Sequence, residues 1–283
     1  MTQPRTVLEV LQSTTAYFQK HQIENPRLNA EHLIAHALGL TRMNLYLEFE
    51  RKLSEQELAP LRERVKRRAQ GEPLQHLLGT VEFCGQTFLC DKRALVPRPE
   101  TEELVELLIS ESGDRKPERI IDVGTGSGII ALSLATKFPE AKILATDISD
   151  DALGLAKENA ARLGLSERVQ FRNGDLLENF PERFDLIVAN LPYVSMQDRQ
   201  SLAREVRHDP EVALFAGQKG DELVRKLIEQ APSHLNPGGM LALEIGINQS
   251  EGLTELLRQK NYHDIRAKKD YSGIARFLLA SYG

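Results

Sequence analysis

The sequence predicts an α/β protein, in which a mostly parallel sheet carries helices on both faces and a small helical domain comes first. After residue 118, short apolar runs rich in Val, Ile and Leu alternate with longer amphipathic runs, as in a parallel sheet with crossover helices. Before residue 76, apolar residues instead recur at the spacing of helices. We therefore expect a helical domain at residues 1–75, a β-hairpin linker at 76–96 and an α/β domain at 97–283.

The composition is ordinary for a globular protein and argues against several broad classes. Of the 283 residues, 41% are hydrophobic and 27% are charged, and the net charge of −5 gives no general attraction to nucleic acid or to anionic membranes. No apolar run reaches the length of a signal peptide or a membrane span. The two cysteines, Cys84 and Cys90, suggest no disulfide framework, so we expect a cytoplasmic protein without a membrane partner.

Three segments of the N-terminal part have the apolar spacing of helices, namely residues 6–21, 26–40 and 54–71. Ser54 followed by Glu57 predicts a capping box, and Gly39 suits the end of the second helix. The basic stretch RERVKRRAQ in the third segment is interpreted as a solvated helix face. His32 and His36 have the spacing of metal ligands but lack a third ligand, so a structural or surface role is expected.

The α/β domain is predicted element by element. A hairpin turning at Gly85 and Gln86 precedes a helix over residues 102–109, for which Thr101 is the expected N-cap. Strands follow at residues 119–126, 142–149, 169–175, 184–190 and 238–246, helices at 127–139, 150–165, 221–235 and 251–262, and a closing hairpin at 265–280. Parallel sheets bind ligands at the carboxyl ends of their strands, which here are residues 124–128, Asp147, Asp175, Asn190 and Glu244.

The stretch IIDVGTGSGII is a glycine-rich turn between a strand and a helix. Its residues Gly124, Thr125, Gly126, Ser127 and Gly128 allow a ligand to approach the backbone and the free N–H groups of the helix N-terminus. The next residue is isoleucine, which breaks the pyrophosphate fingerprint of dinucleotide sites, and no Lys-Ser/Thr pair makes a P-loop. A small carboxylate still suits the turn, and the methionine portion of S-adenosylmethionine carries one.

Two carboxylates at the ends of the next two strands suit the ribose and adenine of S-adenosylmethionine. Asp147 follows the second strand, where a carboxylate accepts hydrogen bonds from both ribose hydroxyls. Asp175 ends the third strand and is expected to accept from the adenine amino group, while Leu176 packs against the ring. A cofactor-free glycine turn is the alternative, but these features follow one another on consecutive strands.

The fourth strand ends in FDLIVANLPYVS, where an amide, a free carbonyl, a proline and a phenol together suit a flat polar group. We expect the Asn190 side-chain oxygen to accept one hydrogen from a substrate –NH₂ beside the methyl donor. Leu191 precedes Pro192 and is biased to extended backbone, so its carbonyl is free to accept the second hydrogen. Tyr193 is expected to pack its ring against the planar group. Taken alone, the tetrapeptide is also compatible with a simple strand-ending turn.

The chain resembles the protein-(glutamine-N5) methyltransferases of peptide chain release factors, the HemK/PrmC family, over nearly its whole length. The resemblance rests on the stretches GEPLQHLLGTVEFCGQTF, LVPRPETEELVE, DVGTGSGIIALSLA, ATDISDDALGLAKENA, FDLIVANLPYV, DPEVALFAGQKG and LALEIG. It implies a class I S-adenosylmethionine-dependent methyltransferase with a Rossmann-like sheet. The implied substrate is the glutamine of the Gly-Gly-Gln motif in release factors.

The resemblance also implies roles for individual residues. S-adenosyl-L-methionine would be bound by Gly124, Thr125, Gly126, Ser127, Gly128, Asp147, Asp175, Leu176 and Asn190. The glutamine amide would be held by the catalytic tetrapeptide of Asn190, Leu191, Pro192 and Tyr193. The N-terminal helices would help to engage the release factor, with residues 98–101 near the site, and no stable nucleic-acid partner is expected.

Two departures from the family pattern keep alternatives open. Leu191 stands where the family usually has proline, and Asn-Leu-Pro-Tyr is typical of rRNA adenine dimethyltransferases. An adenine-N6 methyltransferase acting on RNA or DNA is therefore the alternative function. The stretch QKGDELVRKL is also looser than the Asp-Gly-containing segment of the family. A non-catalytic binding module is a third hypothesis, and the roles of Glu244 and Arg98 are left open.

Overall fold

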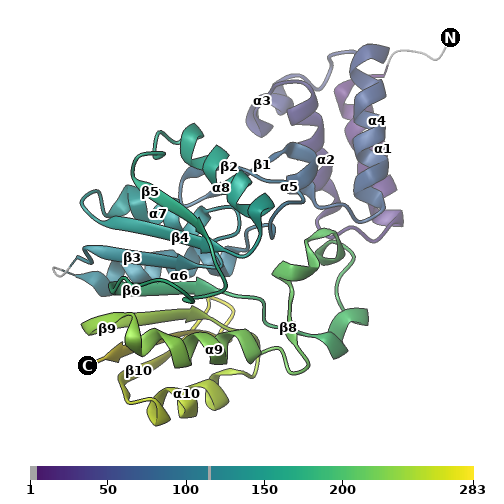
Figure 1. The fold of residues 1–283 in the computed structure, drawn as a ribbon. Coiled ribbons are helices and arrows are strands. Elements are labelled where there is room, and N and C mark those ends of the chain that lie inside the picture. The colour runs from purple at the N-terminus through teal and green to yellow at the C-terminus, as the bar shows by residue number, and fades with distance from the viewer. Residues whose placement is uncertain (1–4, 114–115) are drawn as a thin grey trace. The chain divides into compact units, whose positions relative to one another are not determined.

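The structure is a computed structural model that describes residues 5–113 and 116–283 (Figure 1). The chain forms two compact units. The helical unit consists of Met1–Thr80 and the short segment Ala203–His208, and the α/β unit consists of Val81–Leu202 and Asp209–Gly283. The α/β unit thus begins inside the stretch that was expected to be a linker. No sequence pattern indicates that Ala203–His208 belongs to the helical unit.

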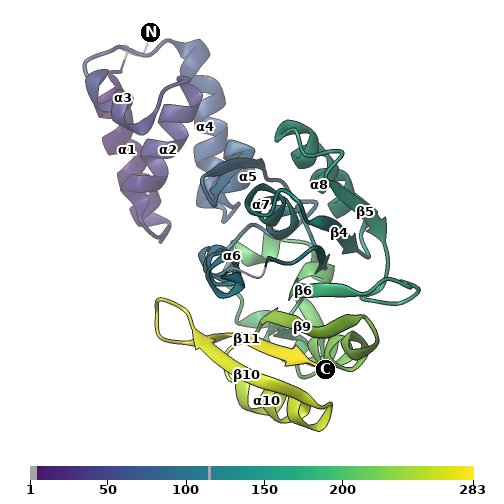
Figure 2. The same ribbon diagram turned by 90° about the vertical axis from the view of Figure 1, so that its left-hand side faces the viewer.

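The helical unit contains α1 (Val7–Lys20), α2 (Pro26–Ala37), α3 (Arg42–Leu47), α4 (Glu55–Ala69) and α5 (Leu74–Leu78) (Figure 2). Helices α1, α2 and α4 were predicted, whereas α3 and α5 are too short to show a clear helical period. The capping box of Ser54 and Glu57 starts α4 as predicted. The core between the helices is apolar, and Phe18, Leu33 and Leu45 are fully buried in it.

The basic stretch of α4 is a solvated face only in part. Arg62 and Arg67 form ion pairs near the surface. Arg68 is instead 2% exposed, and its guanidinium donates to Asn29 Oδ1 (2.7 Å) and to Glu205. The interpretation as a solvated face is therefore wrong for Arg68, which ties two helices to the short segment of the helical unit.

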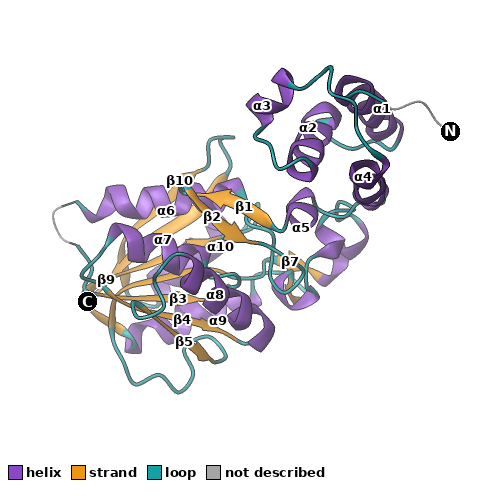
Figure 3. Cartoon of the chain, turned by 90° about the horizontal axis from the view of Figure 1, so that it is seen from above, coloured by secondary structure: helices purple, strands orange, loops and turns teal. Residues whose placement is uncertain are grey.

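The α/β unit is built on a seven-stranded sheet with the strand order β10-β11-β9-β6-β3-β4-β5. Its strands are β3 (Arg119–Val123), β4 (Lys142–Asp147), β5 (Val169–Asn173), β6 (Phe184–Asn190), β9 (Leu235–Glu244), β10 (Tyr262–Lys269) and β11 (Ala275–Tyr282). Figure 3 draws the strands in orange and the helices in purple. The pairs from β5 through β4, β3 and β6 to β9 are parallel, and β11 is antiparallel to both β9 and β10. The predicted mostly parallel sheet with a closing hairpin is therefore confirmed.

Two smaller sheets flank this one in the chain. A hairpin of β1 (Thr80–Phe83) and β2 (Gln86–Leu89) precedes it, at the predicted turn. A short parallel pair, β7 (Val194–Ser195) and β8 (Phe215–Gly217), follows the end of β6 and was not predicted. These last two strands hold the chain that leaves residues 190–193.

Helices cover both faces of the large sheet, because successive strand residues point to opposite sides. Ile120 of β3 belongs to one apolar cluster with residues of α6 (Pro99–Ser112), α7 (Ile129–Lys137) and α8 (Asp150–Arg162). The next residue, Ile121, belongs to a second cluster with α9 (Glu222–Gln230) and α10 (Ser250–Gln259). Within the described ranges, no helix has the length and apolar character needed to cross a membrane.

The start of α6 differs from the prediction. The helix begins at Pro99 with Arg98 as its N-cap residue, rather than at Glu102 after a Thr101 cap. Proline suits the first helical position because its φ is already helical and its missing N–H would have no partner there. Thr101 therefore lies inside the first turn, where it is 2% exposed. Its hydroxyl forms hydrogen bonds with side chains at the end of the sheet.

Candidate active site

A cavity of about 280 Å³ lies at the carboxyl ends of the parallel strands. Its lining includes the predicted residues Gly124, Thr125, Gly126, Ser127, Asp147, Asp175, Leu176, Asn190, Leu191 and Pro192. Gly128 and Tyr193 do not belong to the lining that the described residues form. Arg98 and Thr101 line the same cavity. The cavity thus brings most of the predicted donor and acceptor residues together.

The glycine loop is fixed by the buried carboxylate of Asp122. Its Oδ2 accepts hydrogen bonds from Thr125 Oγ1 (2.6 Å) and from the backbone N–H of Ala131 (3.1 Å). Burial raises the pKa of Asp122 to about 7, although these two hydrogen bonds act in the opposite direction. Gly124 and Gly128 have φ angles of 73° and 83°, which glycine adopts without strain. Sequence reasoning missed Asp122, and the available signal is an acid inside an otherwise apolar strand.

Asp147 at the end of β4 is hydrogen-bonded to this loop. Its Oδ2 accepts the N–H of Gly126 and its Oδ1 accepts the N–H of Ser149, each at 2.9 Å. Burial raises the pKa of Asp147, and the hydrogen bonds from Ser149 and Gly126 oppose that rise. An ionised carboxylate has roughly four acceptor positions, so these two bonds leave capacity for ribose hydroxyls.

Asp175 and Leu176 follow β5 and reach the cavity in different ways. Asp175 Oδ2 accepts from Lys226 Nζ (2.8 Å) of α9. Leu176 has a φ of 52°, a left-handed conformation that costs a residue with a side chain roughly 1–2 kcal/mol. Its side chain is buried in the cavity wall. The contacts of these two residues with adenine stay predictions.

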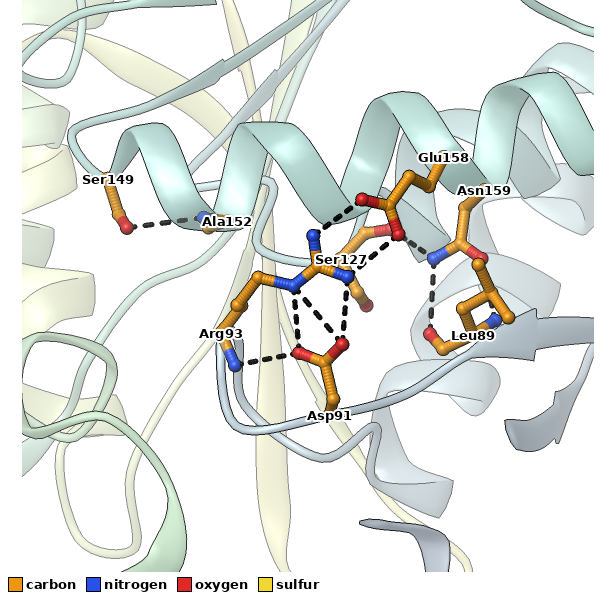
Figure 4. A network of polar contacts seen from close by, with 8 residues as sticks. All are labelled: Leu89, Asp91, Arg93, Ser127, Ser149, Ala152, Glu158 and Asn159. Atoms are coloured by element: carbon orange, nitrogen blue, oxygen red, sulfur yellow. Dashed lines mark hydrogen bonds and ion pairs between the residues drawn. The ribbon is translucent and has the colours of Figure 1, made fainter. Parts of the chain in front are cut away.

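A polar network that the sequence did not indicate anchors the chain after the hairpin (Figure 4). Asn159 of α8 is fully buried, and its Oδ1 accepts the N–H of Leu89 (2.6 Å). Its Nδ2 donates to the carbonyl oxygens of Leu89 (3.2 Å) and Ser127 (3.0 Å). Arg93, which lines the cavity, pairs with Glu158 of the same helix (2.7 Å). Helix α8 therefore holds both β2 and the glycine loop.

Asn190, which is predicted to hold the substrate amide, belongs to a short chain of hydrogen bonds. Strands β6 and β9 are paired so that Asn190 lies beside Glu244. Thr101 Oγ1 donates to Glu244 Oε2 (2.8 Å), and Asn190 Nδ2 donates to Thr101 Oγ1 (2.9 Å). Glu244 is 1% exposed, and burial raises its pKa to about 7 against the effect of the Thr101 hydrogen bond. Glu244, whose role the sequence left open, thus contacts Asn190 through Thr101, and the Asn190 amide also acts on it directly by lowering its pKa.

Leu191 contributes its side chain as well as its backbone. The residue is 4% exposed and belongs to the apolar cluster on the α9 face of the sheet. Its Cδ2 lies 2.8 Å from the position that a Cβ on Gly124 would take. The leucine therefore fills space that the glycine leaves open. The prediction that Leu191 acts through its backbone carbonyl therefore omits the packing of its side chain.

The remaining member of the tetrapeptide, Tyr193, is held by contacts of its own. Gln249 Nε2 donates to the carbonyl oxygens of Tyr193 (3.3 Å) and Gly220 (3.0 Å). The guanidinium of Arg276 lies over the Tyr193 ring, 6.0 Å from its centroid, at the distance of a cation–π contact. Contact between this ring and a planar substrate stays a prediction.

Arg98, the other residue whose role the sequence left open, is fixed at the cavity by a buried acid. Its Nη2 donates to Asp209 Oδ2 (2.7 Å), and Asp209 Oδ1 accepts the N–H of Val96 (3.1 Å). Asp209 comes from the DPEVALF stretch, so this segment and the start of α6 hold each other in place. The contact spans a long stretch of chain and has no local sequence signal.

The residues of the cavity fit S-adenosylmethionine as a donor. Helix α7 begins after Gly128, which provides no side-chain cap, and Asp122 accepts the N–H of Ala131 in its first turn. The N-terminus of this helix suits the donor carboxylate, because helix N-termini present N–H groups to anions. Asp147 supplies oxygen acceptors, and Leu176 and Ile148 supply apolar surface. In the described part of the chain, no three His, Cys, Asp or Glu side chains are grouped to hold a metal ion.

Known proteins resemble the chain over both of its parts. A family model described as the PrmC N-terminal domain matches residues 9–79, and one described as a methyltransferase domain matches residues 114–273. A release factor glutamine methyltransferase of Geobacter sulfurreducens is 41% identical over 282 residues, which are 98% of this chain and 97% of the relative. A release factor glutamine methyltransferase of Deinococcus radiodurans is 40% identical over 272 residues, which are 96% of this chain and 97% of the relative.

Solved structures share the fold at lower identity. A 16S rRNA methyltransferase of Thermus thermophilus, in complex with AdoMet and guanosine, matches with a TM-score of 0.52 and 19% identity over 72% of this chain and 50% of that chain. The α/β unit therefore has the class I methyltransferase fold, with the glycine loop and strand ends in the order expected from the sequence. Because the curated relatives match over nearly the full length of both chains, this chain belongs to the family of release factor glutamine methyltransferases.

Proposed function

We propose that this chain transfers a methyl group from S-adenosyl-L-methionine to the side-chain amide nitrogen of the glutamine in the Gly-Gly-Gln motif of peptide chain release factors. The observation that carries this proposal is the match to curated release factor enzymes over 98% of the chain. That match includes the helical region as well as the donor and acceptor residues. It is therefore more specific than a match to the methyltransferase domain alone.

The donor would occupy the cavity beside the glycine loop. Its carboxylate would meet the N–H groups at the start of α7, and its ribose hydroxyls would donate to Asp147. Asp175 and Leu176 would bind the adenine, with the leucine side chain against the ring. The donor supplies a methyl carbon on a sulfonium, whose sulfur becomes a neutral thioether when the methyl leaves.

The acceptor residues would hold the glutamine amide in one orientation. Asn190 Oδ1 and the Leu191 carbonyl oxygen would each accept one hydrogen of the –NH₂ group. These two hydrogen bonds would turn the nitrogen lone pair toward the methyl carbon, and alignment of this kind supplies a large part of the rate. The nitrogen forms the new bond to carbon and releases one proton to water. No strong base is needed, since the proton can leave after the bond forms.

The helical unit would help to engage the release factor, which is the partner proposed for this chain. This assignment is supported by the match of residues 9–79 to the PrmC N-terminal domain. We further propose a cytoplasmic location, where release factors are found, and no stable nucleic-acid partner. The net charge of −5 agrees with the last point, because nucleic-acid binding depends on neutralising many phosphates.

One methyl-transfer assay separates this function from the alternative. Labelled donor is offered with release factor, ribosomal RNA and DNA in parallel, together with a release factor whose Gly-Gly-Gln glutamine is changed to glutamate. Label is expected in the unmodified release factor and not in the glutamate variant, because the acceptor residues are arranged for an –NH₂ group. Label in RNA or DNA adenine, with none in the release factor, would establish the adenine-N6 alternative suggested by Asn-Leu-Pro-Tyr.

A further inference from the structure

The side-chain amide of Asn190 has two possible orientations, because its oxygen and nitrogen ends have nearly the same shape. Only one of them serves the proposed reaction, in which the oxygen must face the substrate –NH₂ group. In the flipped orientation, the –NH₂ end of Asn190 would face the –NH₂ group of the substrate, and neither could accept a hydrogen bond from the other. The hydrogen bonds between Asn190, Thr101 and Glu244 decide which orientation is stable.

The stable orientation of the Asn190 amide follows from the number of protons that these three side chains can donate. An ionised carboxylate only accepts, so the contact of 2.8 Å between Thr101 Oγ1 and Glu244 Oε2 uses the single hydroxyl proton of the threonine. Toward Asn190, at 2.9 Å, the threonine oxygen can then act only as an acceptor. The atom that faces it must be a donor, which is Nδ2. Oδ1 therefore remains for the cavity that Asn190 lines.

We propose that Glu244 and Thr101 are positioning residues, which set the orientation of the Asn190 amide and thereby present its Oδ1 to the substrate. This inference rests on the proposed function, because it assigns both residues a part in the same methyl transfer. It also accounts for a carboxylate at a position that is 1% exposed, where an ionised group is unfavourable. A neutral side chain in place of Glu244 could both donate and accept, so it would not determine which way the hydrogen bonds to Thr101 and Asn190 point.

The arrangement is fixed by the backbone and not by the three side chains alone. The parallel register of β6 and β9 runs from Leu186 beside Met240 to Asn190 beside Glu244. Thr101 enters from the first turn of α6, whose apolar residues pack on the same sheet. Conservative substitutions at Thr101 and Glu244 are therefore expected to leave the fold intact, and their effects can be attributed to the amide.

The first test separates turnover from binding. Thr101→Val keeps the shape but neither donates nor accepts, Thr101→Ser keeps the hydroxyl, and Glu244→Gln keeps the shape but both donates and accepts. Thr101→Val and Glu244→Gln are expected to lower kcat about tenfold to a hundredfold, with the donor Kd and the KM for release factor changed less than about threefold. Thr101→Ser is expected to stay within about threefold of the wild-type kcat. Thr136→Val, on the exposed side of α7, is the control.

The second test asks whether Thr101 acts through Asn190. In an Asn190→Ala background there is no amide to orient, so adding Thr101→Val is expected to cause no further loss of kcat. A merely structural role of Thr101 would reduce kcat by the same factor in both backgrounds. An additive loss of that kind would overturn the proposal.

The third test needs no turnover. The side-chain –NH₂ protons of Asn190 are identified in the NMR spectrum by their loss in Asn190→Ala. Their exchange with water is expected to be slower by about tenfold or more in the wild type and in Thr101→Ser than in Thr101→Val, because the hydroxyl accepts one of them. Equal exchange rates would refute the positioning role. A wild-type enzyme that shows the slow exchange but methylates no release factor would contradict the proposed function and leave the positioning role supported.

Discussion

Asp147 accepts backbone N–H groups from both Gly126 and Ser149, and these contacts fix its carboxylate at the cavity beside the glycine loop. Asp147→Ala removes the proposed ribose acceptors together with these two hydrogen bonds. We expect the donor Kd to rise about tenfold to a hundredfold, since charge-assisted hydrogen bonds contribute roughly 1.5–3 kcal/mol. Titration calorimetry measures this, with Asp151→Ala on the exposed side of α8 as the control. An unchanged Kd would refute the cofactor role of Asp147.

Leu191 packs the end of β6 against the glycine loop through its buried side chain. Leu191→Ala is expected to lower the free energy of unfolding by about 2–4 kcal/mol, because it leaves a cavity over Gly124. Leu191→Pro keeps the carbonyl but loses most of the same contacts, so it is not expected to behave as the wild type. Urea unfolding and the donor Kd report the two effects. Leu47→Ala, at a leucine that is 84% exposed, is the control and should be nearly neutral.

At the scale of elements, polar contacts join helices of the helical unit in addition to their apolar packing. Glu31 of α2 accepts hydrogen bonds from Arg27 (2.9 Å) in the same helix and from Arg42 (2.9 Å) and Tyr46 (2.6 Å) of α3. Burial acts to raise the pKa of Glu31, but the hydrogen bonds from Tyr46, Arg27 and Arg42 together hold it at about 2. The short helix α3 is thus fixed by a carboxylate at the end of a long side chain.

The Glu31 contacts predict an acid-sensitive junction between these helices. The depressed pKa means that the stabilisation is present above the unfolded-state value of about 4.3 and is lost as the pH falls through about 2. We expect Glu31→Gln to reduce the free energy of unfolding by about 2–3 kcal/mol at pH 7 and by progressively less in acid. Urea titrations at several pH values check this. Glu24→Gln, at an exposed acid, should show no such trend.

At the scale of the whole molecule, stability and turnover are expected to respond to pH in opposite directions. Burial raises the pKa of both Asp122 and Glu244 to about 7 in the folded chain, above the value of about 4 in the unfolded chain. Their contribution to stability is therefore present below a pH of about 4 and is lost as the pH rises through about 7. The orientation of Asn190 requires ionised Glu244, so kcat is expected to rise over the upper part of this range.

The measurement compares melting temperature and kcat between pH values of about 5.5 and 8.5. Glu244→Gln should weaken the pH dependence of both, since it removes one of the two titrating groups and the orientation that depends on it. A kcat profile of the same shape in wild type and Glu244→Gln would contradict this account. The groups that face Glu244 set the pH at which it titrates. Glu100 of α6 raises the pKa of Glu244, whereas Thr101, Asn190 and the β11 residue Arg276 lower it. The charge of Glu244 in turn raises the pKa of the Tyr193 phenol.

Local patterns predicted the sheet and its closing hairpin, and most of the residues predicted for the site line the cavity, because strand ends of a parallel sheet meet at one edge. Thr101 was misassigned as a cap because capping rules consider neighbours in sequence, while its actual partners lie on β6 and β9. Asp122 was missed because it lies within the apolar run of β3. The contact of Arg68 with Glu205 was beyond prediction, since it joins residues far apart in the chain with no periodic signal.

The course of the chain between the two units has a consequence for exchanging parts between relatives. The chain leaves the helical unit after Thr80, returns to it at Ala203 and leaves again after His208. A chimaera spliced once after Thr80 would combine the helices of one parent with the Ala203–His208 segment of the other. Arg68 would then face the other parent's residue at the position of Glu205. The charge of Arg68 would stay buried, and it would lose its counterion unless that residue is also acidic. Transplanting the helical unit therefore takes two grafts from the same parent.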